Sequence, residues 1–128
     1  MDEQSLAVIY RTYLDCLNLR DWASLGRFVD DGVCHNGRQI GLSGYRAMLE
    51  RDVRQIPDLR FELELLVTEP PMIASRLRFV CTPAEPFLGL DTRGKQIAFS
   101  ENVFYAFRGG KIAQVWSVID KSAIEAQL

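Results

Sequence analysis

The sequence has little of what metal and phosphate chemistry require. His35 is its only histidine, which argues against a multi-histidine metal site within one chain. The three cysteines, Cys16, Cys34 and Cys81, lack C-x-x-C spacing, so we expect small buried apolar side chains and not disulfides or zinc ligands. Neither a glycine-rich phosphate loop nor a G-x-S-x-G motif is present, which argues against the chemistry those motifs carry.

Long apolar runs and a dominant sign of charge are also absent. No segment approaches the roughly 20 apolar residues of a membrane span, and the acidic start Met1–Gln4 lacks the basic residues of a signal peptide. The 15 basic and 17 acidic residues leave a net charge of −2. This balance argues against nucleic acid or an anionic membrane as a partner. We therefore expect a cytoplasmic protein.

What the chain does have is the composition of one folded domain. Of its 128 residues, 48% are hydrophobic and 25% charged, a profile typical of globular proteins and not of disordered ones. This length suits one domain, over residues 1–128, better than two.

The pattern of apolar residues changes at Pro57. Before it, spacing typical of helices predicts one over residues 6–17, a short one over 22–28 and, after Ser43 as a candidate N-cap, one to Ile56. A short strand is expected over 33–35. After Pro57, alternation with a period of two predicts four strands, over 61–67, 73–80, 97–107 and 112–120.

Two further segments complete the layout. Residues 83–94 are rich in turn-forming residues and predict a loop, whereas Gly109-Gly110 predicts a tight hairpin. Helices followed by an antiparallel meander indicate an α+β fold with the helices on one side of a sheet. The last strand is apolar on both faces, so we expect a homodimer that packs sheet against sheet.

Polar residues on the inner face of such a sheet are the candidates for chemistry. Asp120 shares its strand parity with Trp116 and Val118. A carboxylate beside an indole in an apolar cavity would have a raised pKa and could transfer protons near neutral pH. The alternative is an exposed carboxylate that faces water or caps the tail 122–127.

The other candidate site residues each have a functional and a structural interpretation. His35 is either a general acid or base or a hydrogen-bonded histidine at a strand end. Glu101 interrupts a row of apolar residues, so it is either a cavity group or, as we favour here, a structural residue that pairs with Arg76 or Arg78 or is turned outward by a register bulge. Two tyrosines on the core face of the first helix, Tyr10 and Tyr13, are packing residues or hold a carbonyl oxygen.

Several motifs together resemble one family. These are Ile56-Pro57-Asp58-Leu59-Arg60-Phe61, Glu85-Pro86-Phe87-Leu88-Gly89-Leu90, Phe107-Arg108-Gly109-Gly110-Lys111-Ile112 and Trp116-Ser117-Val118-Ile119-Asp120. In this combination they are similar to the SnoaL-like polyketide cyclases, also called ester cyclases, of the NTF2-like superfamily. The chain departs from the family pattern at Pro83, where many members have a histidine, and at Glu101, where a small residue is commoner.

The resemblance implies a cone-shaped α+β barrel, usually a homodimer, with a cavity that acts on a small, hydrophobic, carbonyl-bearing ligand without a cofactor. It implies that Asp120 is the general acid/base, removing a proton next to carbonyls so that the enolate closes a ring in an aldol reaction. His35 matches a frequent family histidine, and with Asn36 it would orient the carbonyl; we expect the other substrate contacts from Tyr10, Tyr13, Arg76, Glu101 and Trp116.

Three alternatives stay open at the level of the sequence. One is an isomerase of the ketosteroid isomerase kind, in which Tyr10 or Tyr13 would supply an oxyanion donor. Another is an epoxide hydrolase, which needs one carboxylate to activate water and a second acid. The third is a dimeric module that binds a ligand without catalysis, because one fold hosts many functions.

Overall fold

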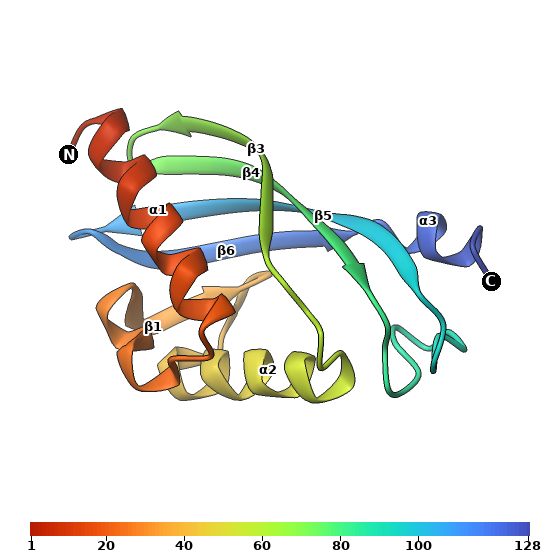
Figure 1. Cartoon of the computed structure of the whole chain (residues 1–128). Helices are drawn as coiled ribbons and strands as arrows, with labels where there is room; N and C mark the ends of the chain where they lie inside the picture. Colours follow the sequence, from red (N-terminus) through yellow and green to blue (C-terminus); the bar gives the residue numbers. More distant parts are fainter.

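The protein was analysed as a computed structural model that describes all residues 1–128. Two long helices, α1 (Glu3–Asn18) and α2 (Gly41–Gln55), lie on one side of a curved sheet (Figure 1). The remaining elements are η1 (Trp22–Arg27), β1 (Val29–His35), β2 (Arg38–Gln39), β3 (Glu62–Glu69), β4 (Met72–Cys81), β5 (Ile97–Arg108), β6 (Lys111–Ile119) and α3 (Lys121–Glu125). The expected α+β class is confirmed, and no helix is long and apolar enough to cross a membrane.

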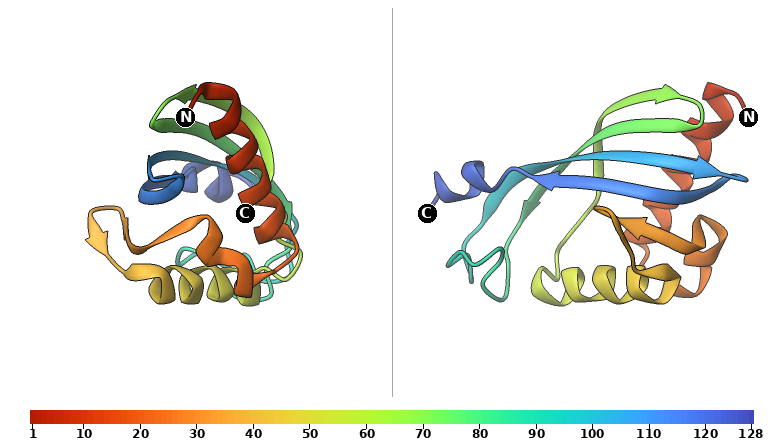
Figure 2. Two further views of the ribbon diagram at one scale, coloured as in Figure 1. Left: turned by 90° about the vertical axis from the view of Figure 1, so that its left-hand side faces the viewer. Right: turned by 180° about the vertical axis from the view of Figure 1, so that it is seen from behind.

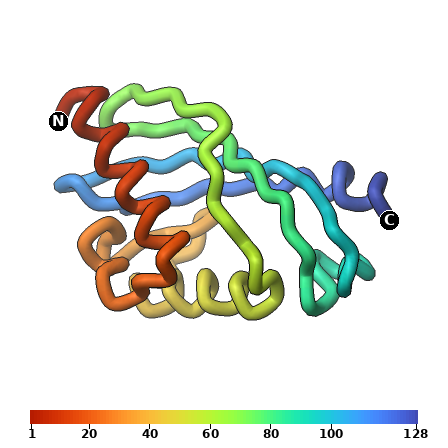
Figure 3. The backbone as a smooth tube through the Cα atoms, viewed as in Figure 1, coloured from red at the N-terminus to blue at the C-terminus, as the bar shows by residue number.

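The six strands form one sheet in the order β2-β1-β6-β5-β4-β3. Strands β3 to β6 form the expected antiparallel meander. Strand β1 instead pairs in parallel with β6, and the connection from β2 to β3, which lie at opposite edges of the sheet, carries α2 beneath it. Strands β4 and β5 bend downward toward the end of α2 (Figure 2), and the tube in Figure 3 shows α1 crossing the opposite half of the sheet. The result is a cone closed by the helices.

Local sequence explains where most elements begin and end. Asp2 caps α1 by accepting a hydrogen bond from Ser5 N at 2.7 Å. Between β5 and β6, Gly109 and Gly110 have φ of 59° and 78°, the pair of positive values that a two-residue hairpin needs.

In the first half of the chain, the observed elements differ in detail from those that the periodicity predicts. The segment over 22–27 is a 3₁₀-helix, and β1 begins at Val29 instead of residue 33, so the strand also includes Asp30, Asp31 and Gly32. Helix α2 starts two residues before Ser43 and has no side-chain cap. These differences are of a few residues and do not alter the order of elements.

The core lies between the helices and the inner face of the sheet. It is a single cluster of 26 buried residues, drawn mainly from α1, α2, β1, β4, β5 and β6, and partly buried side chains of β3 pack against it. Asn18 links α1 to the residue before β3. Its side-chain oxygen accepts a hydrogen bond from Phe61 N at 2.7 Å, and its side-chain nitrogen donates one to Phe61 O at 3.0 Å. The loop of residues 82–96 is tied to the end of α2 by a hydrogen bond from Ala84 N to Gln55 O at 2.8 Å. Phe87, in that loop, thereby becomes buried.

Candidate active site

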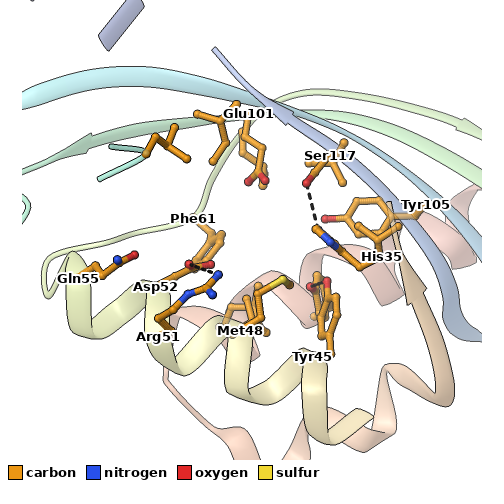
Figure 4. Close-up of a pocket in the computed structure, with 18 of the residues that line it drawn as sticks. His35, Tyr45, Met48, Arg51, Asp52, Gln55, Phe61, Glu101, Tyr105 and Ser117 are labelled. Carbon is orange, nitrogen blue, oxygen red and sulfur yellow. Dashed lines mark hydrogen bonds and ion pairs between the residues drawn. The ribbon is translucent and has the colours of Figure 1, made fainter. Parts of the chain in front are cut away.

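A cavity of about 350 Å³ opens inside the cone, between α2, the inner face of the sheet and the loop of residues 82–96. Of its 19 lining residues, 13 are hydrophobic, which is typical of a site for an apolar ligand with a few polar anchors. Six polar or charged side chains line it besides tyrosines (Figure 4): His35, Arg51, Asp52, Gln55, Glu101 and Ser117.

Glu101 is the inner-face carboxyl group on β5. It sits in the row that also contains Phe99 and Val103, and its neighbours in register are Leu77 and Ile119. No cation pairs with it, because Arg76 turns to the outer face and bonds Glu64 at 3.4 Å. Burial, and then the charge of Asp52, raise the pKa of Glu101 to about 7, while a hydrogen bond from Ser117 opposes them. The structural ion pair favoured from the sequence is therefore wrong.

Asp52 supplies a second carboxyl group from α2. Burial raises its pKa to about 6, with partial compensation from the guanidinium of Arg51 4.0 Å away. Since the charge of Asp52 raises the pKa of Glu101, the two groups titrate as a coupled pair. Near neutral pH the cavity thus holds two carboxyl groups that are both close to gaining or losing a proton.

His35 and Ser117 meet where β1 joins β6. The His35 Nε2 lies 3.2 Å from Ser117 Oγ, and burial lowers the pKa of His35, so its ring is neutral at neutral pH. Asn36 follows with φ of 48°, and its amide bonds the N–H of Ser117 at 2.9 Å and the carbonyl at 3.3 Å. Asn36 does not line the cavity. It holds His35 against Ser117 from outside.

The tyrosines divide between the cavity wall and the layer behind it. Tyr13, Tyr45 and Tyr105 line the cavity, and the hydroxyls of Tyr13 and Tyr45 lie 2.7 Å apart. Tyr10 is fully buried behind them, where its hydroxyl lies 2.6 Å from Ser75 Oγ. Of the two tyrosines expected from the first helix, only Tyr13 reaches the cavity.

Asp120 and Trp116 lie outside the cavity. Trp116 is 39% exposed on the outer face of the sheet, whereas Asp120 is exposed and caps α3 by accepting from Ala123 N at 3.2 Å. The cause is a register shift between β5 and β6 at Ala106–Phe107, after which Ile112 and Ala113 are both buried. A count of every second residue from the buried Ile112 therefore assigns Trp116 and Val118 to the inner face, although the bulge places them on the outer face. The expectation that Asp120, His35 and Trp116 share a pocket is wrong.

Comparison with known proteins identifies the family. The model of the SnoaL-like polyketide cyclases matches residues 7–128. The chain belongs to this family. A crystal structure of a SnoaL-like polyketide cyclase from Agrobacterium tumefaciens strain C58 is 53% identical, with a TM-score of 0.95 over 99% of this chain and 98% of that one. The family expected from the motifs is confirmed.

More distant solved structures share the fold alone. TsrD from Streptomyces laurentii is 23% identical, with a TM-score of 0.86 over 99% of this chain and 96% of that one. AclR from Streptomyces galilaeus, a proposed hydroxylase, is 16% identical, with a TM-score of 0.81 over 98% and 96%. A comparison with curated protein sequences finds no match.

In this SnoaL-like chain, three further residues that were not predicted as site residues line the cavity: Asp52, Tyr45 and Ser117. A signal existed for each. Asp52 lies seven residues after Tyr45, so both fall on the stripe of α2 that faces the core. Ser117 lies between Val115 and Ile119 in the parity that faces the cavity. A polar residue inside an otherwise apolar stripe is the pattern that finds all three.

Proposed function

We propose that the chain, as a single SnoaL-like domain, is an acid–base enzyme that needs no cofactor and acts on a small hydrophobic substrate bearing a carbonyl group. Glu101 is the general base in this proposal, in place of Asp120. The observation that carries it is a carboxyl group that faces a largely apolar cavity without a cation partner. A base whose pKa lies near the working pH combines a large ionised fraction with adequate strength.

The reaction begins with proton transfer from carbon. The Glu101 carboxylate removes a proton from the carbon next to the carbonyl, the C–H electron pair forms a C=C bond, and the carbonyl π pair moves to oxygen. In ring closure, the family model, the enolate carbon then attacks a second carbonyl of the same molecule. The resulting alkoxide recovers the proton from Glu101, so that no external oxidant or reductant is needed.

The surroundings of Glu101 support this role. Burial, and then the charge of its neighbour Asp52, keep the pKa of Glu101 high, and the hydroxyl of Ser117 lines the same cavity. Neutral His35 holds Ser117 in turn. The aromatic rings of Phe61 and Phe87 line the apolar part of the cavity, which favours an aryl or polyketide-like ligand of modest size.

The test uses β-tetralone in heavy water, because exchange of the hydrogens beside its carbonyl reports proton abstraction without knowledge of the natural substrate. We expect the protein to accelerate deuterium incorporation, measured by NMR. Glu101→Gln should lose at least about 100-fold of this acceleration, the usual contribution of a general base. Asp120→Asn, the matched control, keeps a helix-capping side chain and should retain the rate. Loss in Asp120→Asn with retention in Glu101→Gln would overturn the assignment.

A second candidate is hydrolysis of an epoxide, favoured by the presence of two carboxyl groups in one cavity. Ionised Asp52 would take a proton from water as the water oxygen forms a bond to an epoxide carbon, the C–O bond of that carbon breaks, and protonated Glu101 donates a proton to the departing oxygen. A proton that passes from Asp52 to Glu101 then restores both groups. The product diol would carry one oxygen from solvent. Mass spectrometry after reaction in water enriched in heavy oxygen separates this outcome from ring closure, which incorporates none.

We also propose that the protein is a homodimer through the outer face of the sheet. Large apolar side chains in that face are exposed, including Phe104 at 55%, Trp116 at 39% and Val118 at 69%. Phe104 and Trp116 are neighbours in register, and Ala74 and Val67 extend the row across β4 and β3. An apolar row that crosses four strands fits a second copy of the same sheet, as in packed β-sandwiches.

A further inference from the structure

The four tyrosines of the chain form one buried cluster whose hydroxyl protons can be counted. Tyr10, Tyr13, Tyr45 and Tyr105 are each no more than 3% exposed. The rings of Tyr10 and Tyr105 lie 4.9 Å apart, and those of Tyr10 and Tyr13 lie 6.0 Å apart. A phenol hydroxyl donates only one hydrogen bond although it can accept others. The direction of each bond therefore decides which protons are left for a ligand.

The first chain of hydroxyls ends at Tyr105. The geometry between Tyr10 and Tyr105, 3.3 Å apart, makes Tyr10 the donor. Because Tyr10 has one proton, its other partner, Ser75, must donate to it across 2.6 Å. The bonds then run in one direction, from Ser75 to Tyr10 to Tyr105. No hydrogen bond in the structure uses the proton of Tyr105.

A second free donor comes from Tyr13 and Tyr45. Their hydroxyls are 2.7 Å apart and form one hydrogen bond, in which either can be the donor. Two hydroxyls carry two protons, and one bond uses only one of them. Whichever residue donates, the other retains a proton with no acceptor in the protein. The cluster thus holds two unused O–H donors, one on Tyr105 and one on this pair.

Both unused donors belong to residues that line the cavity, whereas Tyr10 does not. Figure 4 shows Tyr45 and Tyr105 on the His35 side of the cavity, with the carboxyl group of Glu101 also pointing into it. Burial raises the pKa values of Tyr13 and Tyr105 well above their usual range, so these groups keep their protons and act as donors. A buried donor without an acceptor destabilises the protein, and a ligand oxygen that accepts its hydrogen bond removes this cost.

We propose that the Tyr105 hydroxyl, together with the free hydroxyl of the Tyr13–Tyr45 pair, forms an oxyanion site that binds enolates and phenolates. The inference rests on the proposed function, for which Glu101 supplies the base. As Glu101 takes the proton from carbon, the carbonyl π pair moves to oxygen, and this oxygen accepts hydrogen bonds from the two tyrosines. Preorganised donors at the position where charge develops are among the strongest contributors to catalysis.

The charge balance in the cavity fits this arrangement. Proton transfer to Glu101 removes its negative charge at the moment when the substrate oxygen becomes negative, so the cavity does not gain a second anion. An ionised Glu101 disfavours a second negative charge nearby, because its own charge raises the pKa values of Tyr13 and Tyr45. The oxyanion site should therefore bind a phenolate best when Glu101 is neutral.

The test measures binding of para-nitrophenol, whose ionised form absorbs visible light, and it does not require turnover. Glu101→Gln serves as the parent because it keeps residue 101 neutral at every pH. Addition of Tyr105→Phe should weaken binding of the phenolate by about 10- to 100-fold, as expected for a lost hydrogen bond to a charged acceptor. Addition of Tyr10→Phe removes a buried hydroxyl of the same chain that does not touch the cavity, so it should weaken binding by about threefold or less.

Equal affinity in the parent and the Tyr105→Phe variant would overturn the proposal, and so would equal losses in the Tyr105→Phe and Tyr10→Phe variants. A measurement on the unaltered chain covers the case in which a variant does not fold. Below pH 7, where Glu101 is protonated, proton NMR should show a new, strongly downfield hydroxyl resonance with para-nitrophenol but not with nitrobenzene. No such resonance would contradict the site. If the protein binds the phenolate but does not accelerate hydrogen exchange of β-tetralone, the oxyanion site is supported and the assignment of Glu101 as the base is rejected.

Discussion

Replacement of Glu101 by Gln is expected to stabilise the folded protein at high pH while it abolishes proton abstraction. Glutamine has the shape of a protonated glutamate but cannot ionise, so the variant avoids burial of a charge. The wild-type protein must bury that charge above pH 7, because its carboxyl group then faces an apolar cavity without a cation. Stability and activity should thus change in opposite directions at one residue.

The size of the effect follows from the pKa of Glu101 in the two states. It rises from the usual 4.5 to about 7 on folding, so the folded state binds the proton more tightly. The contribution of Glu101 to the free energy of unfolding is fully present below pH 4.5, and it is lost as the pH rises from 4.5 to about 7. The full shift corresponds to about 3 kcal/mol, and we expect about 1–3 kcal/mol because solvent reaches the cavity and screens the charge.

Thermal unfolding at two pH values measures this difference. At about pH 9, Glu101→Gln should raise Tm by roughly 3–10 °C, whereas at about pH 4 the variant and wild type should unfold at the same temperature. Asp120→Asn is the matched control, since it is also a carboxylate-to-amide change but at an exposed position outside the cavity. A Tm difference for Glu101→Gln that stays constant with pH, or a variant that is less stable at about pH 9, would refute the reasoning.

Three further changes test other parts of the molecule. Asp52→Asn removes the charge that raises the pKa of Glu101, so the acidic limb of the pH profile for β-tetralone exchange should move to lower pH; an unmoved limb contradicts the coupling. Trp116→Arg places a charge in the exposed apolar row and should convert dimer to monomer in sedimentation velocity, so a dimer that persists argues against this interface. Asn18→Ala removes both hydrogen bonds to the backbone of Phe61 and should lower the free energy of unfolding, measured in urea, by about 1–3 kcal/mol. A loss below about 0.5 kcal/mol would show that these two hydrogen bonds do not stabilise the fold as expected.

Periodicity was enough to predict the order of elements. Apolar residues at helical spacing marked α1 and α2, and alternation after Pro57 marked the four long strands, because burial of one face imposes these periods directly on the sequence. The 3₁₀ segment η1 and the early start of β1 escaped this reasoning. Their backbone is set by contacts between elements, such as the hydrogen bond from Ile112 N to Phe28 O at 2.7 Å, and not by local propensity.

The candidate site was predictable only in part. His35, Tyr13 and Glu101 were named from the sequence and do line the cavity. Asp120 was named from a motif and a parity count, and the count failed at the irregularity beside Phe107. A shift of one residue moves every later side chain of a strand to the opposite face, so a single bulge is enough to exchange Ser117 for Trp116.

The sequence by itself determined the fold class, the family and the presence of an unusual carboxyl group in an apolar row. Composition, spacing and motifs carry that information because they act within short stretches of chain. Only the tertiary structure decided which carboxyl group faces the cavity, that Asp52 approaches it from α2 and that the tyrosine hydroxyls hydrogen-bond with one another. These features depend on register and on side chains from distant elements, such as Tyr13 and Tyr45, whose meeting no local pattern encodes.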